Sequence, residues 1–542
     1  MYGSGDSAHP SLILAAGLLL AYLVYGGVYR LVLSPIARFP GPRLAALTFW
    51  YEFYYDVVLS GRYTWRIAEM HEKYGPVVRI NPYELHVNVP EFYDTLYVST
   101  ASGRRTEKWE WSAKMFGTTK AAVGTTSHAL HRVRRAALNP FFSRRSVARL
   151  EPAIQANVNK LRKRLEGFAD KGKPVNLTDA LTALSADVIG DFAFGRSYGF
   201  LDAEDFNPGW HKLMLDLSRG THLMKQFGWL YAILTCIPQR LVSIIHPLTK
   251  ELFDVQNSIT AQIEDIKSGK STITRKEHNK DSTPPTILHD LLGTKNNLPP
   301  PELTTPRLTE EAFTLLGAGT VTTAHTLATT IYHVLASSSC LDRLQTELAS
   351  LYQSLPEGEQ PTWTNLEQLP YLSAVLFEGL RLSYGVSHRL PRISPDTALH
   401  VPDVDEAVAT IPPGVPVSMT QMFIHEDPSI FPEPTAFRPE RWLEDSDQVG
   451  VSDEERTKRK EEIARRRRFL VPFSKGTRQC VGMNLAYAEM YLGLAGLLKP
   501  GLGLELWETG EEDVRCAHDW FNPAPVMGSK GVRVMVKKEI RA

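Results

Sequence analysis

The sequence predicts a mainly α-helical protein with small β-sheets, preceded by one transmembrane helix. Three patterns lead to this prediction. Apolar residues recur with helical periodicity over most of residues 145–270 and again at about 308–337, 339–354 and 366–383. Short segments in which apolar and polar residues alternate, typical of strands, lie at 77–80, 84–89 and 531–537. An uncharged apolar run lies near the N-terminus.

The apolar run from Ser11 to Tyr29 is long enough to cross a bilayer. Its nineteen residues would span about 28 Å as a helix, close to the thickness of the hydrocarbon core. A cleaved signal peptide is the alternative, but its apolar region is usually shorter and follows basic residues. Here Asp6 precedes the run, and arginines follow it at positions 30, 38 and 43. We therefore predict a membrane anchor over residues 1–36, with one domain, residues 37–542, on the cytoplasmic side.

Composition excludes several classes of protein. The 60 basic and 60 acidic residues give zero net charge, which argues against nucleic acid as the main partner. The four cysteines, at positions 236, 340, 480 and 516, are widely spaced and form no C-x-x-C motif. A disulfide framework and a zinc site are therefore not expected, and a reducing compartment fits better.

The segments between these elements are predicted from their composition. Phe39-Pro-Gly-Pro42 is a stiff hinge that cannot continue a helix. Residues 43–75 are predicted to form an amphipathic helix rich in Tyr and Trp, which suits a membrane interface. Residues 267–285 are polar and unpatterned, as in a surface loop. Beyond residue 383 the chain is rich in proline and is predicted to be irregular up to Cys480.

The run from Phe473 to Gly482 contains the most specific signal in the chain. A lone cysteine in a glycine-rich loop suits an anionic sulfur ligand of haem iron. Gly476 permits a turn with positive φ, and Gly482 lets the backbone approach a flat group closely. Arg478 can reach a haem propionate, and Phe473 can shield the sulfur from water. The apolar helix that follows would stabilise a thiolate at its N-terminus. A buried, inert cysteine is the alternative.

The loop fits the pattern F-x-x-G-x-R-x-C-x-G and resembles the cytochrome P-450 superfamily of haem-thiolate monooxygenases. Further family motifs follow in the expected order, and the resemblance spans roughly residue 39 to the C-terminus. It implies a cytochrome P-450 fold in which residues 37–542 form the catalytic domain. It also implies that Cys480 is the ligand of the iron of haem b.

Residues Ala318-Gly-Thr-Val-Thr-Thr323 lie in a long helical stretch, although glycine and threonine disfavour helix interiors. Close packing against a neighbouring helix is one explanation, and a local opening of the hydrogen-bond ladder for a small ligand is the other. In the family, the pattern A/G-G-x-D/E-T-T crosses the distal face of the haem. The resemblance therefore implies that Ala318 and Gly319 lie against the haem. It also implies that Thr322 hydrogen-bonds dioxygen and supports proton delivery.

Val321 departs from the family pattern, which usually has an acid at this position. Valine can neither relay a proton nor order water. Protons then come from another group or directly from water, or the chemistry tolerates poor delivery. We expect part of the reducing equivalents to be lost as peroxide.

Glu378 and Arg381 have a spacing that places both side chains on one face of a helix. Alone, this motif fits an ordinary surface ion pair. The later segment Phe437-Arg-Pro-Glu-Arg-Trp442 resembles the family's P-E-R-F/W motif. The resemblance implies that Arg441 joins Glu378 and Arg381 in a buried network that holds the loop of Cys480.

Several cations are candidates for contacts with the haem propionates or with a partner. The run His131-Arg-Val-Arg-Arg135 resembles the family's W/H-x-x-x-R helix, so His131 and Arg135 are candidates for propionate contacts, as is Arg392. A basic, solvated helix face is the alternative for the first two. The basic runs 458–460 and 465–468 precede the loop of Cys480. They fit either solvated charge or the docking of an acidic electron donor.

The resemblance implies a monooxygenase that inserts one oxygen atom from O2 into a C–H or C=C bond. No dinucleotide fingerprint is present, so electrons are expected from NADPH through a separate NADPH-dependent cytochrome reductase. The family and the anchor imply the endoplasmic reticulum membrane, with a cytosolic catalytic domain. Two other functions stay open: a haem-thiolate isomerase or dehydratase that needs no reductase, and a non-catalytic haem-binding protein.

Three further runs, at 29–48, 73–82 and 138–145, resemble filamentous-fungal members of secondary metabolism, of the trichodiene-oxygenase-like kind. They imply a small lipophilic substrate, such as a terpenoid, polyketide or alkaloid intermediate. The segments expected to line its pocket are mostly apolar. These are Thr118 to Thr126, Phe206 to Trp229, Leu315 to Thr322, Val386 to Leu390 and Trp520 to Val526.

Overall fold

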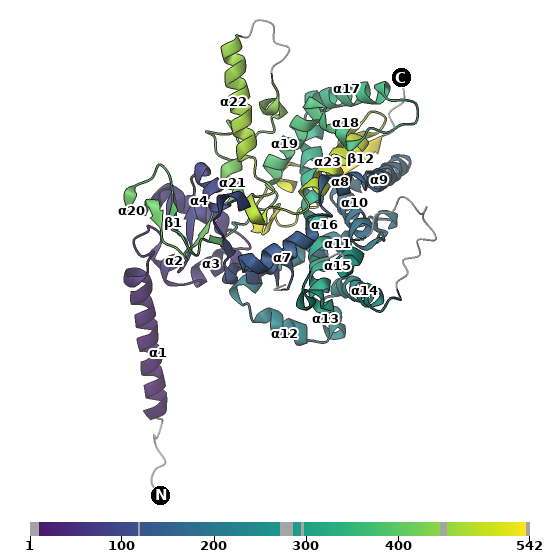
Figure 1. The fold of residues 1–542 in the computed structure, drawn as a ribbon. Helices are drawn as coiled ribbons and strands as arrows, with labels where there is room; N and C mark the ends of the chain where they lie inside the picture. The colour runs from purple at the N-terminus through teal and green to yellow at the C-terminus, as the bar shows by residue number, and fades with distance from the viewer. Residues whose placement is uncertain (1–9, 118–119, 271–285, 294–297, 445–451, 538–542) are drawn as a thin grey trace.

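The computed structural model describes residues 10–117, 120–270, 286–293, 298–444 and 452–537. The described chain is mainly helical with four small sheets, so the predicted fold class is confirmed. Figure 1 shows a broad helical body from which one N-terminal helix projects. The polar segment 267–285, predicted to be a surface loop, lies mostly outside the described residues.

The projecting helix is α1, Pro10–Val28, and it continues as a π-helical turn, Tyr29–Leu33. Residues Ser11–Leu33 have a mean hydropathy of 2.0, and none of this span is buried against the body. By length and composition it is a helix that could cross a membrane. The hinge that follows is packed firmly, because Ile36 and Phe39 are buried in the core.

The other α-helices belong to the body. They are α2 Arg43–Leu47, α3 Trp50–Phe53, α4 Tyr63–Tyr74, α5 Tyr93–Leu96, α6 Glu110–Ala113, α7 His128–Leu138, α8 Arg144–Ala148, α9 Glu151–Lys171, α10 Leu177–Phe194, α11 Pro208–Gln226, α12 Leu230–Cys236, α13 Gln239–Ile245, α14 Thr249–Lys267, α15 Ile287–Leu292, α16 Thr305–Leu335, α17 Ser338–Ser354, α18 Trp363–Glu367, α19 Pro370–Ser383, α20 Glu406–Ala409, α21 Gln421–His425, α22 Asp453–Phe469 and α23 Met483–Leu498.

The largest sheet has five strands in the order β1-β2-β8-β5-β3. Its strands are β1 Val77–Arg79, β2 Leu85–Val87, β8 Pro416–Ser418, β5 Arg392–Ile393 and β3 Glu107–Lys108. A second sheet contains β4 Val175–Asn176, β12 Arg533–Lys537 and β9 Gly503–Leu506. Two hairpins complete the set: β6 Leu399–His400 with β7 Thr410–Ile411, and β10 His518–Trp520 with β11 Asn522–Ala524.

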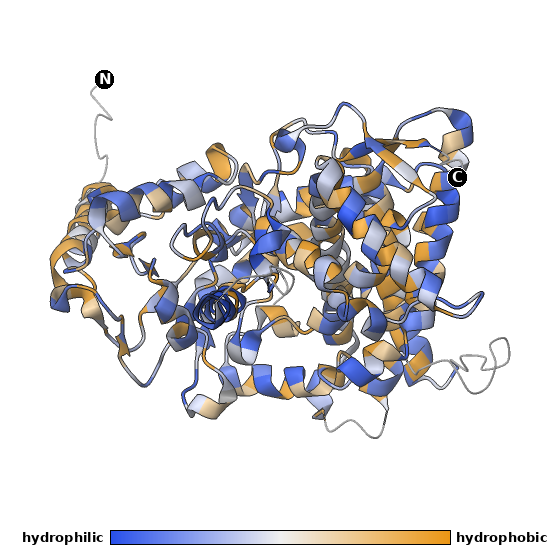
Figure 2. Ribbon diagram, turned by 90° about the horizontal axis from the view of Figure 1, so that it is seen from above, coloured by the Kyte–Doolittle hydropathy of each residue, from blue (hydrophilic) through white to orange (hydrophobic). Residues whose placement is uncertain are grey.

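Helix α16 is the centre of the body and packs against α10, α14, α19 and α23. Hydrophobic residues are concentrated on these inner helices, as Figure 2 shows. The contact between α16 and α10 explains Gly319, since a Cβ there would press against the side chain of Ile189. Close helix packing, one of the two explanations offered for this glycine, is therefore observed.

Two secondary-structure predictions made from the sequence are wrong. The helix expected over 43–75 is broken into α2, α3, a π-helical turn (Tyr54–Val58) and α4, with Gly61 at a positive φ of 79° before α4. The irregular region expected before Cys480 contains α22, a helix of 17 residues. Its apolar periodicity is nearly absent, and it begins instead with a capping box between Ser452 and Glu455.

Candidate active site

The loop of Cys480 is shaped by its glycine and by its contacts with two neighbouring segments. A 3₁₀ turn, Gly476–Arg478, leads into the cysteine, and Gly476 has a φ of 78°. A Cβ at this position would overlap with the carbonyl oxygens of Tyr97 and Val98. The amide of Cys480 donates to the carbonyl of Phe473 at 2.9 Å. The loop is therefore a tight turn that accepts only glycine at position 476.

The thiol of Cys480 is solvent-accessible, although protein atoms surround it closely enough for desolvation to raise its pKa. Two neighbours oppose that shift and lower the pKa: the backbone N–H of Gly482 and the charge of Arg135. Arg135 also donates to the carbonyl of Gln479 at 2.7 Å. Helix α23 begins three residues after the cysteine. The groups around the thiol are thus those that stabilise a thiolate ligand.

Five cationic side chains gather beside this loop: Lys108, His131, Arg135, Arg392 and Arg478. Burial, together with the charges of the other four, lowers the pKa of His131 to about 2. Burial and the charge of Arg392 lower the pKa of Arg478 to about 9. Within the described ranges, none of the five has a carboxylate at ion-pairing distance. They form a partly buried site for anions, in which His131 and Arg392 are the buried members.

The contacts of these cations leave some of their donors free. Arg478 donates to the carbonyls of Thr125 and Thr126 at 2.6 and 2.7 Å, and its Nε is buried without a partner. Lys108 donates to the carbonyl of Val123 at 2.5 Å. Lys108 was missed in the sequence because nothing local marks it. Its role comes from the pairing of β3 with β5, which sets Lys108 opposite Arg392.

This set of residues fits haem. A soft thiol flanked by a helix N-terminus suits the iron, and a partly buried group of unpaired cations suits two carboxylate groups. Gly482 has open space where a Cβ would point, which allows a flat group to approach the backbone. Phe473 packs its ring at 5.2 Å from that of Tyr487 beside the loop.

Helix α16 presents small and polar residues along one face. Ala318 is exposed and Thr322 is half-buried, whereas Thr320, Val321 and Thr323 are buried. The local opening of the helix considered above is not seen, because α16 is continuous from Thr305 to Leu335. Its threonine hydroxyls bond the preceding turn instead, as Thr322 Oγ1 does with the carbonyl of Ala318 at 2.9 Å.

Glu378, Arg381 and Arg441 form a buried network. Both side chains of the pair on α19 are fully buried, and Arg441 donates to Glu378 Oε1 at 2.9 Å. Burial alone would raise the pKa of Glu378, but the two arginines hold it below its usual range. The indole N–H of Trp442 donates to the same carboxylate at 2.9 Å. The surface ion pair considered above is therefore excluded by the geometry.

His425 connects this network to the cysteine loop, and no sequence motif marked it for this role. Its Nδ1 lies 3.0 Å from the carbonyl of Arg381, and its Nε2 accepts a bond of 2.9 Å from the amide of Val471. Burial, reinforced by the charge of Arg381, lowers the pKa of His425 to about 3. The neutral ring is thus a fixed link between α19 and the start of the loop.

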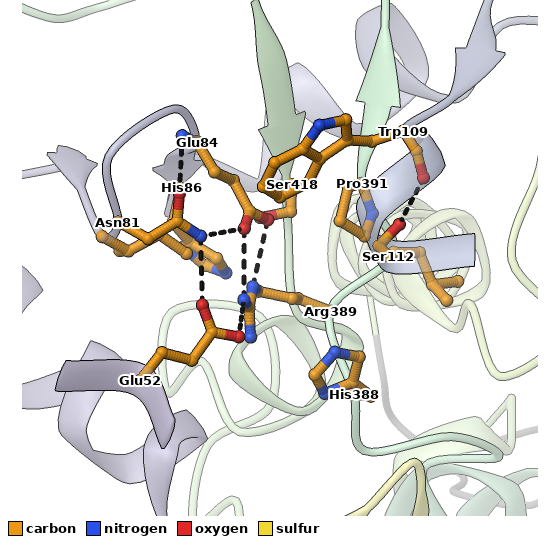
Figure 3. Close-up of polar contacts among 12 residues, drawn as sticks. Glu52, Asn81, Glu84, His86, Trp109, Ser112, His388, Arg389, Pro391 and Ser418 are labelled. Atoms are coloured by element: carbon orange, nitrogen blue, oxygen red, sulfur yellow. Dashed lines mark hydrogen bonds and ion pairs between the residues drawn. The ribbon is translucent and has the colours of Figure 1, made fainter. Parts of the chain in front are cut away.

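A second buried network fixes the segment Val386 to Leu390. Arg389 donates to Glu84 at 3.0 Å and to Glu52 at 2.6 Å, and Lys225 on α11 donates to Glu52 at 2.6 Å. Figure 3 shows Arg389 pointing between the two carboxylates, which Asn81 also bridges, while Ser418 bonds Glu84. Opposite charges offset each other here, so the segment is held rigidly.

Three of the five segments expected to line a substrate pocket meet at Asp519. Ser387 Oγ and His388 Nδ1 bond its carboxylate at 2.8 and 2.9 Å, and His222 Nε2 lies 2.5 Å from its carbonyl oxygen. Phe521 packs edge-on against Phe116, with ring centroids 4.9 Å apart. Residues 118 and 119 of a fourth segment lie outside the described residues.

The two basic runs belong to α22, which Figure 1 shows standing away from the body. Arg466 is buried and donates to the carbonyl of Arg441 at 3.0 Å. Arg465 and Arg468 are exposed. One arginine of the second run therefore supports the Glu378 network. Its exposed neighbours Arg465 and Arg468 form surface ion pairs with Glu91 and Asp94.

Comparisons with known proteins point to one family. A family model described as Cytochrome P450 matches residues 40–500. The chain is 42% identical over 528 residues to cytochrome P450 monooxygenase tpcC of Cochliobolus heterostrophus, covering 95% of each chain. It is 42% identical over 513 residues to tryptophan 6-hydroxylase fscE of Fusarium equiseti, covering 94% of each. It is 41% identical over 530 residues to N-acetyltryptophan 6-hydroxylase ivoC of Emericella nidulans, covering 98% of each.

Proposed function

The chain belongs to the cytochrome P450 family, and from this premise we propose that Cys480 holds the iron of haem b in a monooxygenase of fungal secondary metabolism. The observation that carries the assignment is the partly buried set of cations beside the Cys480 loop, which has no carboxylate partners among the described residues. Lys108, Arg392 and Arg478 would hold the propionates, and His131 lies among them. When bound, the haem supplies activation of O2 and oxidation of an unreactive C–H bond.

The chain's own residues prepare and shield this chemistry. Arg135 and the amide of Gly482 favour the thiolate form of Cys480. Thr322 offers a hydroxyl oxygen on the exposed face of α16, and Ala318 leaves room beside it. His425 and the Glu378 network fix the loop from behind. None of these groups must move far for the reaction, which keeps the site preorganised.

We propose a small lipophilic substrate, with indole compounds as the first class to test. Two relatives are named for the 6-hydroxylation of tryptophan and N-acetyltryptophan. The edge-on pair of Phe116 and Phe521 suits a flat aromatic ring. A terpenoid or polyketide intermediate is the alternative, and it would use the same apolar walls.

We propose that the enzyme sits on the endoplasmic reticulum membrane. An apolar surface on α12 and α13, which we call the α12–α13 surface, adds to the anchor helix; it exposes Trp229, Ile233, Leu234, Leu241, Ile244 and Ile245. Figure 1 shows these helices on the side toward which α1 projects. Deletion of residues 2–28 should therefore weaken membrane association without abolishing it. Complete release of the deleted form into the soluble fraction would contradict a second contact.

The electron donor would be an NADPH-dependent reductase that docks on the exposed arginines around α22. Arg465 and Arg468 lie on this surface, near the start of the Cys480 loop. Reversal of both charges should raise the KM for reductase without altering the carbon monoxide spectrum. An unchanged KM would place the docking surface elsewhere.

The test is the carbon monoxide difference spectrum of the reduced protein, followed by turnover assays. Wild type should show the thiolate-type band, Cys480→Ser should lose it, and Cys236→Ser, which changes an exposed cysteine on α12, should keep it. Product formation should require both NADPH and reductase. Turnover without reductase would indicate the isomerase or dehydratase, and a normal spectrum with no turnover of any tested class would favour a haem-binding protein.

A further inference from the structure

The side chain of Val321 cannot deliver protons to Thr322. Val321 stands where the family usually has an acid, and its side chain is buried in the hydrophobic core. A replacement group on α16 must share the exposed face of the helix with Thr322. Two residues are not buried between Thr320 and Tyr332, and these are Thr322 and His325.

His325 lies on the same face as Ala318 and Thr322. The spacing of seven residues from Ala318 and three from Thr322 places the three side chains in one row along the helix. Within the part of the chain that the structure describes, neither ring nitrogen of His325 makes a hydrogen bond, and the residue is half-buried. An imidazole without partners beside the threonine of the motif is free to bind water or exchange protons.

His211 lies on α11, close enough to His325 for its charge to lower the pKa of that ring. Thr182 donates its hydroxyl hydrogen to the carbonyl of Thr178 at 2.7 Å, so its oxygen accepts from Nδ1–H of His211 at 3.0 Å. That contact leaves Nε2 of His211 unprotonated and free to accept a proton. Helix α11 packs against both α10 and α16, and the charge of His211 acts on His325.

We propose that His211 and His325 form a proton route to Thr322, replacing the acid that Val321 lacks. The proposal rests on the assignment of Thr322 to the oxygen-binding side of a haem monooxygenase. Thr322 already donates its own hydrogen to Ala318, so its oxygen has lone pairs available for a donor at His325. Side chains three residues apart on a helix are neighbours, and one water molecule can complete the contact.

Each transfer conserves protons and moves no electrons. A proton from solvent binds Nε2 of His211 and passes to the nearer nitrogen of His325. His325 releases the proton on its other nitrogen to Thr322 Oγ1. Thr322 turns its own hydroxyl hydrogen away from the carbonyl of Ala318 and passes it to a water molecule on the exposed face of α16. Each group gains one proton and loses one, so no charge accumulates. Electrons reach the enzyme separately, from NADPH through the reductase.

The electrostatics of the two rings suit such a route. Burial lowers the pKa of both His211 and His325 to about 4, with the charge of His211 contributing to the shift at His325. Both rings are therefore neutral near pH 7, and each carries one N–H donor and one acceptor nitrogen. Among the described residues, no titratable group on α10, α14, α19 or α23 shifts the pKa of His325. A neutral relay therefore operates across the neutral pH range.

The experiment compares wild type with His325→Phe, His325→Glu and His211→Gln, with His333→Phe as the control. His333 is a half-buried histidine of the same helix that lies two turns beyond His325 and stacks on Phe437. Product formed per NADPH should fall at least about tenfold in His325→Phe, with a matching rise in peroxide. The product formed per NADPH should fall less in His211→Gln. In His325→Glu it should return most of the way to the wild-type value, because a carboxyl group also relays protons.

Two further readouts separate proton delivery from mere structure. The solvent deuterium isotope effect on turnover should rise in His325→Phe. The C–O stretching band of the reduced, carbon monoxide-bound protein should shift in this variant and stay unchanged in His333→Phe. The proposal would be overturned if His325→Phe kept both the wild-type C–O stretching band and the wild-type product formed per NADPH. A change in His325→Phe that is confined to the KM for substrate would overturn it as well. Absence of the thiolate-type band in wild type would instead overturn the proposed function.

Discussion

Lys108 and Arg392 lie directly opposite each other on the antiparallel strands β3 and β5. Like charges in this position are destabilising, and neither residue has a carboxylate at ion-pairing distance among the described residues. Burial, followed by the charges of Arg392 and Arg478, lowers the pKa of Lys108 well below its usual range. The chain thus keeps an unfavourable pair that two propionates would neutralise.

Lys108→Met should therefore act in opposite directions on the haem-free and haem-bound protein. The lost contact with a charged group should weaken haem retention by roughly 1.5–3 kcal/mol, about ten- to a hundredfold. The free energy of unfolding of the haem-free protein should not fall, because a repulsion is removed. Haem transfer to apomyoglobin and urea unfolding measure the two effects. Lys114→Met, which changes a half-buried lysine paired with Glu110, is the control. Equal haem retention in both variants would remove Lys108 from the site.

Arg381→Ala should yield protein without bound haem. Arg381 makes two bonds to Glu378, and its loss would leave a buried carboxylate without its main partner, at a cost of roughly 3–5 kcal/mol. The same variant would release the carbonyls of His425 and Ala436, which brace the approach to the loop. The ratio of Soret to protein absorbance gives the haem content. Arg438→Ala removes an exposed ion pair with Glu433 and should keep its haem. Normal haem in Arg381→Ala would refute the structural role.

Gly476→Ala should disrupt the cysteine loop, whereas Gly414→Ala should be tolerated better. Both glycines have φ near 80°, so each alanine pays a similar cost of roughly 1–2 kcal/mol for the left-handed backbone. They differ in their surroundings: a Cβ at 476 overlaps two backbone carbonyls, and one at 414 meets no atom within 4 Å. Haem content and urea midpoints should separate the two variants. A smaller loss at 476 than at 414 would mean that the turn is not rigid.

The fold class and the sequence motifs were predictable because both are local. The loop of Cys480, the pair Glu378 and Arg381, and the position of Thr322 on a long helix could be located because short motifs there resemble those of the family. Other parts of the site depend on long-range packing. Lys108 enters the site through strand pairing, and His425 through contacts with residues 44 and 46 positions away in the chain.

The helix α22 shows a second limit of reading the sequence. Its charged residues leave it with almost no apolar stripe, so the usual signal for a helix is missing. Acidic residues in its first turn and arginines in its last turn favour the helix through its dipole, and a capping box closes its start. Between α2 and α4 the sequence pattern predicts a helix that is not there. Aromatic periodicity continues across Gly61, but the positive φ of this residue interrupts the helix.

Acid should detach the cysteine loop through His425. Its folded pKa of about 3 lies below the unfolded value near 6.5, so the unfolded state binds the proton more tightly. The stabilisation is fully present above about pH 6.5 and is lost as the pH falls toward 3, by up to about 1.4 kcal/mol per pH unit. Protonation of Nε2 would also replace an acceptor with a donor facing the amide of Val471. Haem release should accompany this loss, because Val471 begins the segment that leads to Cys480.

His425→Gln tests this mechanism, since an amide can donate and accept without titrating. Wild type should lose stability and haem steeply below about pH 6, whereas the variant should show a lower stability at neutral pH and a flatter decline. His400→Gln, which changes an exposed histidine on β6, should follow wild type. Urea unfolding and the Soret band measured between about pH 7 and pH 4 give both curves. Parallel curves for wild type and His425→Gln would assign acid sensitivity to the other buried histidines, among them His71 and His388, whose pKa values burial lowers to about 4. Because those rings lie outside the link between α19 and the loop, they would reduce stability without selectively releasing the haem.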